Sequence, residues 1–173
     1  MAIRVGYFKV HYPLEFYATF FSVRSKQYDI NTMIRGEEAI IERLEQLKHR
    51  EKQGGEKLSP KEQEQYKTLQ IALEMVERGY KFSNIDLYRS DAVNFVVDHE
   101  NKALIPPFAT IDGLGENNAV TVIEARKEKP FTSREDLLSR TKLTGTNVKD
   151  LVDMHVLDDL PETDQLSLFD FDF

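Results

Sequence analysis

Apolar residues recur at helical spacing near the start of the chain. Beyond Pro13 they fall on one face of a helix, at Leu14, Tyr17, Ala18 and Phe21. Proline is tolerated in the first turn of a helix, so Pro13 marks a place where one helix ends or another begins. The many aromatic residues around this stripe predict that the helix is buried.

A second amphipathic pattern follows, and its other face is highly charged. Ile40, Leu44 and Leu47 mark one face of a helix that stops before the pair Gly54-Gly55. We interpret the charged face as a solvated surface, which is what such a pattern usually is.

The next helix has a clear start signal in the segment SPKE. Ser59 is the predicted N-cap, Pro60 occupies the first helical position, and Glu62 closes a capping box. The apolar stripe of this helix is Tyr66, Leu69, Leu73 and Val76, and Gly79 is its predicted C-cap. The two helices together predict a helical hairpin.

Beyond Gly79 the pattern changes to short β-like runs. Phe95–Val97 and Ala103–Ile105 flank the polar stretch 98–102, and the pair Pro106-Pro107 ends the second run because proline cannot donate to a strand ladder. This segment predicts a small β-hairpin.

The segment IDGLGENNAVTVIEAR, residues 111–126, interrupts a helical pattern with Gly113-Leu114-Gly115. Glycines permit a positive φ and a close approach of the backbone to a partner. The N–H groups at the start of the following helix have no helical acceptor, and such a nest of donors suits a phosphate.

Three interpretations of this turn compete. A dinucleotide fingerprint would need a preceding parallel strand and a third glycine where Asn118 stands, so it fits poorly. A tight turn between packed helices, without any ligand, remains open. The third interpretation is a phosphate-binding hairpin.

The third interpretation rests on a resemblance to the helix-hairpin-helix motif of DNA-binding proteins. The matching positions are Ile111, Gly113, Leu114, Gly115, Ala119, Val122 and Ile123, whereas Asp112 replaces the proline that is frequent there. The resemblance implies that the backbone grips phosphates of duplex DNA without reading the bases. The implied DNA-binding residues are the backbone donors Gly113, Leu114 and Gly115, the side chains of Asn117 and Asn118, and the cations Lys127 and Lys129.

Two shorter helices are predicted after this motif. Ser133 caps a helix that carries Leu137 and Leu138, and Thr146 or Asn147 starts another. The apolar residues of the last helix are Val148, Leu151 and Val152. The region 111–152 therefore predicts tandem helix-hairpin-helix-like units.

Longer segments resemble one family of bacterial replicative DNA polymerases, the C family. The segments PFTSREDLLSR and HVLDDLP resemble the region after its helix-hairpin-helix, and GYFKVHYPLEFYATFFSVRS resembles its region beyond the catalytic palm. Through LIPPFATIDGLGENNA, EARKEKPFTSREDL and QLSLFDF the match is closest to the Gram-positive PolC-type DNA polymerase III. The resemblance covers nearly the whole chain, and the charged hairpin 37–77 is its least specific part.

The resemblance also indicates what this sequence lacks. Such a polymerase binds Mg²⁺ through carboxylates of its palm and exonuclease, and these carboxylates have no counterpart in this sequence. The sequence also contains no other pattern of metal ligands. We therefore expect no catalytic residue, no metal site and no cofactor in this chain, which we interpret as a C-terminal piece: a truncated form, a split product or an incomplete gene. The alternatives are a stand-alone adaptor that binds DNA and clamp, and a repair nuclease or glycosylase, for which no catalytic residue is identifiable.

The charge of the chain is concentrated at its end. The formal net charge is −7, but seven of the 30 acids lie in residues 153–173, which leaves 23 acids against 23 bases in the first 152 residues. The acidic balance therefore does not argue against nucleic acid. The absence of cysteine, of a signal pattern and of a membrane-spanning run predicts a cytoplasmic protein, which the resemblance would place at the nucleoid and replisome, with no membrane contact.

The last nine residues, QLSLFDFDF, carry large apolar side chains in an acidic stretch. They resemble the motif with which bacterial proteins bind the sliding clamp, the beta subunit. The implied clamp-binding residues are Gln165, Leu166, Ser167, Leu168 and Phe169. The amide of Gln165 suits a hydrogen-bonding rim, while Leu168 and Phe169 suit apolar pockets. A terminal edge strand that turns its phenylalanines toward the core is the alternative.

We thus predict an α+β fold that is mainly α. The predicted parts are a helical region with a charged hairpin in residues 1–80, a β-hairpin with a helix-hairpin-helix DNA-binding region in 81–160, and a flexible acidic clamp-binding tail in 161–173. The predicted function is to hold duplex DNA non-specifically and to tether a replicative polymerase to its clamp. The expected partners are duplex DNA, the sliding clamp and the remainder of the polymerase.

Overall fold

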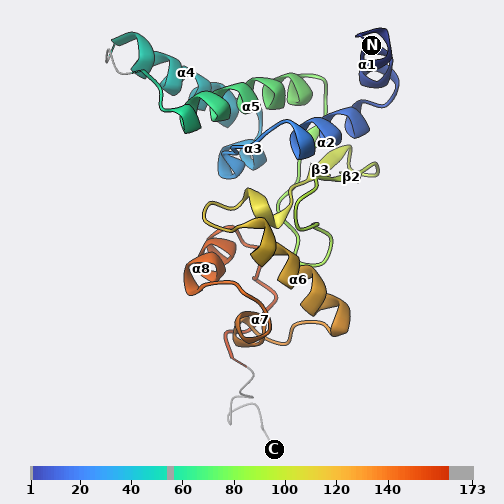
Figure 1. Cartoon of the computed structure of the whole chain (residues 1–173), viewed down its shortest axis with the longest axis vertical. Helices are drawn as coiled ribbons and strands as arrows, with labels where there is room; N and C mark the ends of the chain where they lie inside the picture. The colour runs from blue at the N-terminus through green and yellow to red at the C-terminus, as the bar shows by residue number, and fades with distance from the viewer. Residues whose placement is uncertain (1, 54–56, 164–173) are drawn as a thin grey trace, which may run out of the picture.

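The computed structural model describes residues 2–53 and 57–163. The mainly helical α+β fold predicted from the sequence is confirmed. The elements are α1 (Ala2–His11), α2 (Pro13–Val23), α3 (Ile30–Arg35), α4 (Glu37–Gln53), α5 (Pro60–Glu77), β1 (Lys81–Phe82), β2 (Val96–Asp98), β3 (Ala103–Ile105), the 3-10 helix η1 (Phe108–Thr110), α6 (Glu116–Glu128), α7 (Arg134–Arg140) and α8 (Gly145–Asp153). Figure 1 shows α1–α5 at one end of the long axis, α6–α8 at the other, and the sheet between them.

Helix α2 lies at the centre of the first hydrophobic core. Tyr17 and Phe21 are completely buried, and Leu14 is nearly so, which confirms the helix predicted after Pro13. The ring of Phe21 lies edge-on to that of Phe82, with centroids 5.3 Å apart, so the helix is packed against the sheet. The sequence did not predict the two short helices that flank this region, α1 and α3.

The helical hairpin α4–α5 forms as predicted, with the capping box in place. The Ser59 backbone N–H donates to Glu62 at 2.9 Å, and the Glu62 N–H donates to the Ser59 hydroxyl at 3.3 Å. The most deeply buried residues of α5 are Leu69, Ala72 and Met75, while the predicted stripe residues Tyr66, Leu73 and Val76 are half-buried. The buried face of α5 is rotated relative to the predicted stripe. The reason is that α4 covers one side of α5, while Tyr17 of α2 contacts Glu74 on another side.

The predicted β-hairpin is present as the antiparallel pair β2–β3, in the register Val97 opposite Leu104. The structure adds a strand that the sequence pattern missed. Strand β1 pairs parallel with β3, which gives the strand order β1-β3-β2. A strand of two residues carries no alternation of polar and apolar positions, so periodicity cannot reveal it.

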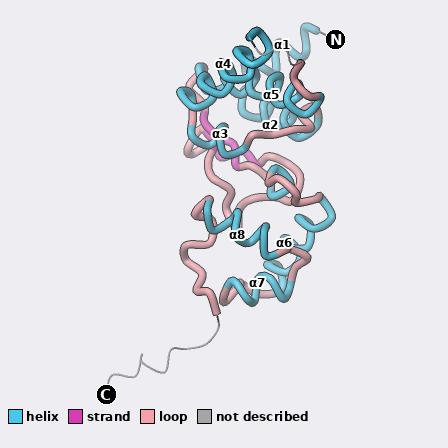
Figure 2. The backbone as a smooth tube through the Cα atoms, turned by 90° about the vertical axis from the view of Figure 1, so that its left-hand side faces the viewer, coloured by secondary structure: helices cyan, strands magenta, loops and turns pink. Residues whose placement is uncertain are grey.

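A second hydrophobic core forms around α6, α7 and α8, which Figure 2 shows together at the end nearer the C-terminus. Arg140 joins two of these helices. Its guanidinium donates to Asp136 at 2.9 Å and to the carbonyls of Ala125 and Lys129 at the end of α6, the latter at 3.1 Å. The same group lies 4.8 Å from the centre of the Phe131 ring. Burial alone would raise the pKa of Asp136, but hydrogen bonds from Arg140 and from the Thr132 N–H hold that pKa below its usual value.

The start of α8 differs from the sequence prediction. The helix begins at Gly145 with Thr144 as N-cap, and not at Thr146 or Asn147. The prediction was wrong because Asn147 has another role at the third helical position. Its side chain accepts the Thr144 N–H at 3.0 Å, and its own N–H donates to the Thr144 hydroxyl at 3.2 Å. This reciprocal pairing is a capping box, and it fixes Thr144 as the N-cap.

We expect Thr144→Ala to lower the free energy of unfolding by about 1 kcal/mol, because the substitution removes a side-chain cap from α8. Thr146→Ala is the matched control, since Thr146 is an exposed threonine in the first turn of the same helix. Urea unfolding of both variants measures the difference. Equal midpoints would show that the capping box does not stabilise the helix.

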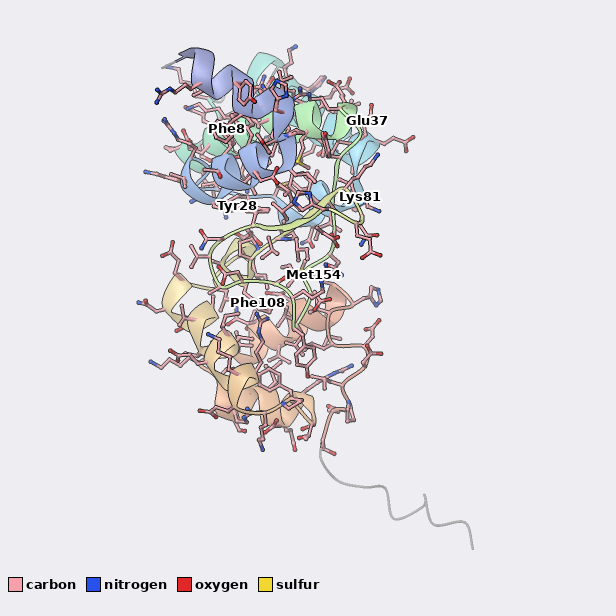
Figure 3. All side chains as sticks on the ribbon, turned by 90° about the vertical axis from the view of Figure 1, so that its right-hand side faces the viewer. Phe8, Tyr28, Glu37, Lys81, Phe108 and Met154 are labelled. Carbon is pink, nitrogen blue, oxygen red and sulfur yellow. The ribbon has the colours of Figure 1, made fainter. Side chains whose placement is uncertain are left out.

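The two cores meet near Met154, which packs against residues of both. Figure 3 labels Met154 at the junction of the two ends of the molecule, with Tyr28 on one side and Phe108 on the other. The Asn84 side chain donates to the Met154 carbonyl at 2.6 Å, across the junction. Strands β1 and β3 contribute Phe82 and Leu104 to the first core, and Phe95, just before β2, belongs to the same core. The predicted division at residues 80/81 and 160/161 stays a prediction.

Candidate nucleic-acid interface

The glycine turn is held on a rigid base. The N–H groups of Phe108 and Ala109 donate to the carbonyls of Asp91 and Ala92, at 3.1 and 3.0 Å. Ile111 and Leu114 are buried in the second core, so the turn between them is anchored at both ends. Gly113 has a φ of 76°, a conformation that residues with a Cβ rarely adopt.

Gly115 is the N-cap of α6, and it offers this helix no side-chain cap. Its carbonyl accepts the N–H groups of Asn118 and Ala119, both at 3.0 Å, while no side chain caps the helix. By contrast, the N-cap side chains of α3, α5, α7 and α8 each accept a backbone N–H group; these residues are Asp29, Ser59, Ser133 and Thr144. The start of α6 therefore keeps a donor that α3, α5, α7 and α8 each satisfy with a side chain.

Five backbone N–H groups at this turn donate to no acceptor within residues 2–53 and 57–163; they belong to Asp112, Gly113, Gly115, Glu116 and Asn117. Gly113, Gly115 and Asn117 are exposed, and a Cβ added to either glycine would meet nothing within 4 Å. The turn thus presents an open, donor-rich stretch of backbone, which is the arrangement that suits a phosphate oxygen.

The other predicted hairpin residues have different surroundings. The Leu114 N–H donates to the Ile111 carbonyl at 3.1 Å, and its side chain is buried. Asn117 is exposed and Asn118 is half-buried, both in the first turn of α6. The DNA contacts of these three residues stay predictions.

Lys127 and Lys129 are not near the glycine turn. Lys127 lies in the last turn of α6 and Lys129 is its C-cap, so a rise of 1.5 Å per residue separates Lys127 from Gly115 by about 18 Å. Lys129 also lies 3.9 Å from the carboxylate of Asp136. These two cations can meet a different phosphate from the one at the turn, and their predicted role remains untested.

A different cation, which the sequence did not single out, lies beside the turn. The loop between α2 and α3 and the segment Ala109–Gly115 line a groove of about 390 Å³, and Lys26 and Gln27 form part of its wall. Lys26 is exposed and forms no ion pair within the part of the chain that the structure describes. It is far from the turn in sequence, so no local pattern indicates that the two lie together.

The loop that carries Lys26 is fixed by Tyr28. The Tyr28 hydroxyl donates to the carbonyl of Ser25 at 2.9 Å and to that of Phe21, and its own carbonyl accepts the Gln65 side chain at 3.1 Å. Burial and the nearby carboxylate of Glu116 raise the pKa of Tyr28 to about 12. Lys26 is therefore presented from an ordered loop.

Acidic groups lie on the other side of the turn. Asp112 lines both the groove beside Lys26 and a larger cleft of about 870 Å³, and its carboxylate pairs with Lys61 at 2.9 Å. The acids of that cleft are Asp29, Glu62, Asp112, Asp150 and Asp153, against the cations Arg43 and Lys61. Because acids outnumber cations there, the groove beside Lys26 suits a phosphate better than this cleft does.

The second hairpin, between α7 and α8, presents a different surface. The Lys142 N–H donates to the Thr121 hydroxyl at 3.0 Å, which holds this turn against α6. The capping box of Thr144 and Asn147 occupies donors at the start of α8. Lys142 and Lys149 are exposed on this hairpin.

No group of three or more histidines or carboxylates placed to hold a metal occurs among the residues that the structure describes. Within the same residues, the helices are all too short or too polar to cross a bilayer.

Comparison with known families identifies this half of the molecule. A family model described as "Helix-hairpin-helix motif" matches residues 79–166, about half of the chain. The chain belongs to the helix-hairpin-helix motif family. The matched range takes in α6, α7 and α8, so the hairpins described above are the motif that this family shares.

Curated relatives extend the similarity to nearly the whole chain. The chain is 46% identical over 169 residues to the DNA polymerase III PolC-type of Halalkalibacterium halodurans, and 47% identical over 170 residues to that of Streptococcus pneumoniae serotype 2. The Bacillus cereus protein of the same name is 44% identical over 169 residues. Each alignment covers 98% of this chain but only 11% of the relative. The resemblance to PolC-type DNA polymerase III that the sequence motifs predict is confirmed.

The predicted clamp-binding residues, 165–169, lie outside the residues that the structure describes. Their role stays a prediction from the sequence.

Proposed function

We propose that this chain is the part of a PolC-type DNA polymerase III that holds duplex DNA without sequence preference and tethers the enzyme to its sliding clamp. Similarity over 98% of the chain to relatives of that name supports the assignment to the polymerase. Catalysis would belong to the much longer remainder of the protein, with Mg²⁺ bound there. A cytoplasmic location at the replisome follows from the same proposal.

One observation carries the DNA-holding part of the proposal. The first hairpin of a helix-hairpin-helix family member leaves the start of α6 without a side-chain cap and with backbone donors exposed. A helix N-terminus carries a partial positive charge and attracts anions. DNA phosphates fit this feature because they are anionic acceptors, and backbone donors contact them irrespective of base sequence.

The expected binding is weak. The Glu116 carboxylate lies in the first turn of α6 and Asp112 lies in the turn itself, so negative charge adjoins the phosphate position. A surface that neutralises only one or two phosphates binds near the non-specific range, with a Kd of about 10⁻⁴ to 10⁻⁶ M at physiological salt. Weak duplex binding suits a part of a larger enzyme that has to slide along its product.

The proposal is tested by titrating a fluorescent duplex with the purified chain. We expect the anisotropy to rise with the same midpoint for unrelated sequences, and the affinity to fall steeply as salt increases. Absence of binding at 50 mM salt and 1 mM protein, or a strong preference for one sequence, would overturn the DNA-holding role.

Lys26→Ala should weaken duplex binding by roughly threefold and reduce the salt slope by about 0.9, the value for one phosphate contact. The physical reason is that Lys26 stands beside the hairpin donors and forms no ion pair with another described residue. Lys48→Ala is the matched control, because Lys48 is an exposed lysine on α4, outside this groove. An unchanged slope in Lys26→Ala would mean that this lysine contacts no phosphate.

The tethering part of the proposal rests on the sequence of the tail. The motif Gln165-Leu166-Ser167-Leu168-Phe169 offers one amide and two adjacent large apolar side chains to a clamp pocket. Burial of such side chains contributes about 1.5–3 kcal/mol each, and ordering a tail removes part of that gain. We expect micromolar affinity for the clamp, about −8 kcal/mol.

A further inference from the structure

Helices α1 and α2 expose an apolar surface that the DNA-holding role does not use. Of the ten large hydrophobic side chains that are exposed among the described residues, six lie between residues 5 and 23; they are Val5, Tyr7, Phe8, Val10, Tyr12 and Val23. Several border a groove of about 670 Å³ between the two helices, with Phe16 and Phe20 in its wall. We refer to this surface as the α1–α2 groove.

The groove lies far from the hairpin. Figure 1 shows α1 at the opposite end of the long axis from α6, α7 and α8. In Figure 3, Phe8 is labelled in the same end of the molecule as Glu37, well away from Phe108. A role for this surface is therefore independent of the phosphate site.

Helix α1 is stabilised by few contacts with the rest of the described chain. It packs on α2, and it reaches α5 through polar contacts: the Lys9–Glu74 ion pair at 2.6 Å, and a hydrogen bond that Arg78 donates to the Lys9 carbonyl at 3.3 Å. A helix of ten residues is marginal on its own in water. Val5 and Phe8 are about half exposed and Val23 is 70% exposed, so further apolar surface is available for burial.

The charges around the groove restrict what can cover it. Arg4 and Arg24 line its rim, and neither forms an ion pair within the part of the chain that the structure describes. Glu15, the acid on the rim, already lies 3.1 Å from His99. A self-complementary contact between two copies would bring the same arginines together, whereas a partner with an apolar ridge flanked by carboxylates would complement them.

The relatives supply a candidate partner within one polypeptide. The alignment takes in 169 of 173 residues, so at least most of α1 and α2 belongs to the shared sequence. It covers 11% of the relative, which leaves about nine-tenths of that protein to cover the groove. Exposed apolar patches of this kind mark interaction sites in soluble proteins.

We propose that the α1–α2 groove is the surface on which the remainder of a PolC-type polymerase packs, through an apolar ridge flanked by carboxylates that pair with Arg4 and Arg24. This inference rests on the proposed membership in that polymerase. It deepens that proposal because it names the surface through which the hairpins are attached to the enzyme body. Docking at this end leaves the hairpin at the far end free for DNA.

The absence of cysteine from the chain permits a direct test. Val23→Cys places a single thiol in the groove, and Ile41→Cys places one on the exposed face of α4 as the matched control. Each variant is prepared as the isolated chain and within the Streptococcus pneumoniae polymerase, where it replaces the aligned segment. The rate of maleimide labelling at each position is measured by mass spectrometry of the peptide that contains the introduced cysteine.

We expect the thiol at position 23 to react about tenfold or more slowly in the chimeric polymerase than in the isolated chain, because its exposure then requires opening of the interface. The thiol at position 41 should react equally fast in both. Adding Phe8→Asp to the chimera should restore fast labelling at position 23, since a charge in the groove opposes burial. If the chimera does not fold, the chain is co-expressed with the polymerase that lacks the aligned segment and labelled in the same way.

Equal labelling rates at position 23 in the isolated and assembled forms would overturn the inference. The inference would also be overturned if the isolated chain protects the thiol at position 23 more strongly at higher protein concentration and sedimentation shows that it self-associates. A second copy of the chain would then be the occupant of the groove. Duplex titrations of the same variants keep the two proposals apart. Protection at position 23 without DNA binding removes the DNA-holding role alone, and DNA binding without protection removes the groove alone.

Discussion

Gly115→Asp is expected to weaken duplex binding by a factor of ten or more without lowering the stability of the protein. Gly115 is the N-cap residue of α6 but has no side chain with which to cap the helix. Aspartate is among the best N-cap residues. Its φ of −70° is accessible to any residue, and a Cβ there meets nothing within 4 Å. The new carboxylate would therefore accept the N–H groups that we assign to phosphate and would also repel the phosphate.

Gly115→Ser separates the two causes. Serine also caps a helix through its side chain but carries no charge, so its effect on DNA affinity should be intermediate. Binding is measured by anisotropy at 50 mM salt, and stability by the urea midpoint of each variant. If both variants gain stability and keep the wild-type affinity, the start of α6 does not bind phosphate.

Gly113 would give a less informative variant. Its φ of 76° lies in the left-handed region, where a side chain costs roughly 1–2 kcal/mol. A loss of DNA binding on substitution at Gly113 could then result from a distorted turn. At Gly115, by contrast, a substitution can change DNA binding without lowering stability. Gly115 is therefore the decisive position for testing the proposed function.

The parts of the fold that the sequence predicted well are those with local signals. Ser59, Pro60 and Glu62 form a capping box from adjacent residues, so the start of α5 is readable without tertiary information. The glycine turn is similarly local, because the positive φ that this turn uses at Gly113 is readily adopted by glycine but not by residues with a Cβ. The start of α8 was harder because both Thr144 and Asn147 are capping residue types, and only their reciprocal bonds show which one is the N-cap.

The candidate site shows which neighbours the sequence alone does not place. Lys127 and Lys129 were grouped with the hairpin because they are close in sequence, yet the length of α6 puts them at its other end. Lys26 lies beside the hairpin because Tyr28 fixes its loop through contacts with Phe21 and Gln65, which no pattern in the sequence indicates. Tertiary packing, not sequence proximity, therefore decides which cation lies beside the turn.

The largest effect is expected at residues 165–169 of the tail, which lie outside the residues that the structure describes. Leu168→Ala combined with Phe169→Ala should weaken binding of the chain to a bacterial sliding clamp by at least about two orders of magnitude. Each side chain is expected to contribute about 1.5–3 kcal/mol through burial in the clamp, and the double variant loses both. Gln165→Ala should cost about 0.5–1.5 kcal/mol, because a hydrogen bond at the rim largely exchanges with water.

Surface plasmon resonance on immobilised clamp measures these losses, and thermal unfolding of the same variants distinguishes the two interpretations of the tail. A tether predicts lost binding with an unchanged Tm, whereas a terminal edge strand predicts a lower Tm and no effect on the clamp. Leu138→Ala is the matched control, since Leu138 is an exposed leucine of α7 that belongs to no predicted clamp motif. A double variant that unfolds earlier but still binds the clamp like the wild type would refute the tether, because the apolar side chains of the tail would then be serving the protein's own core.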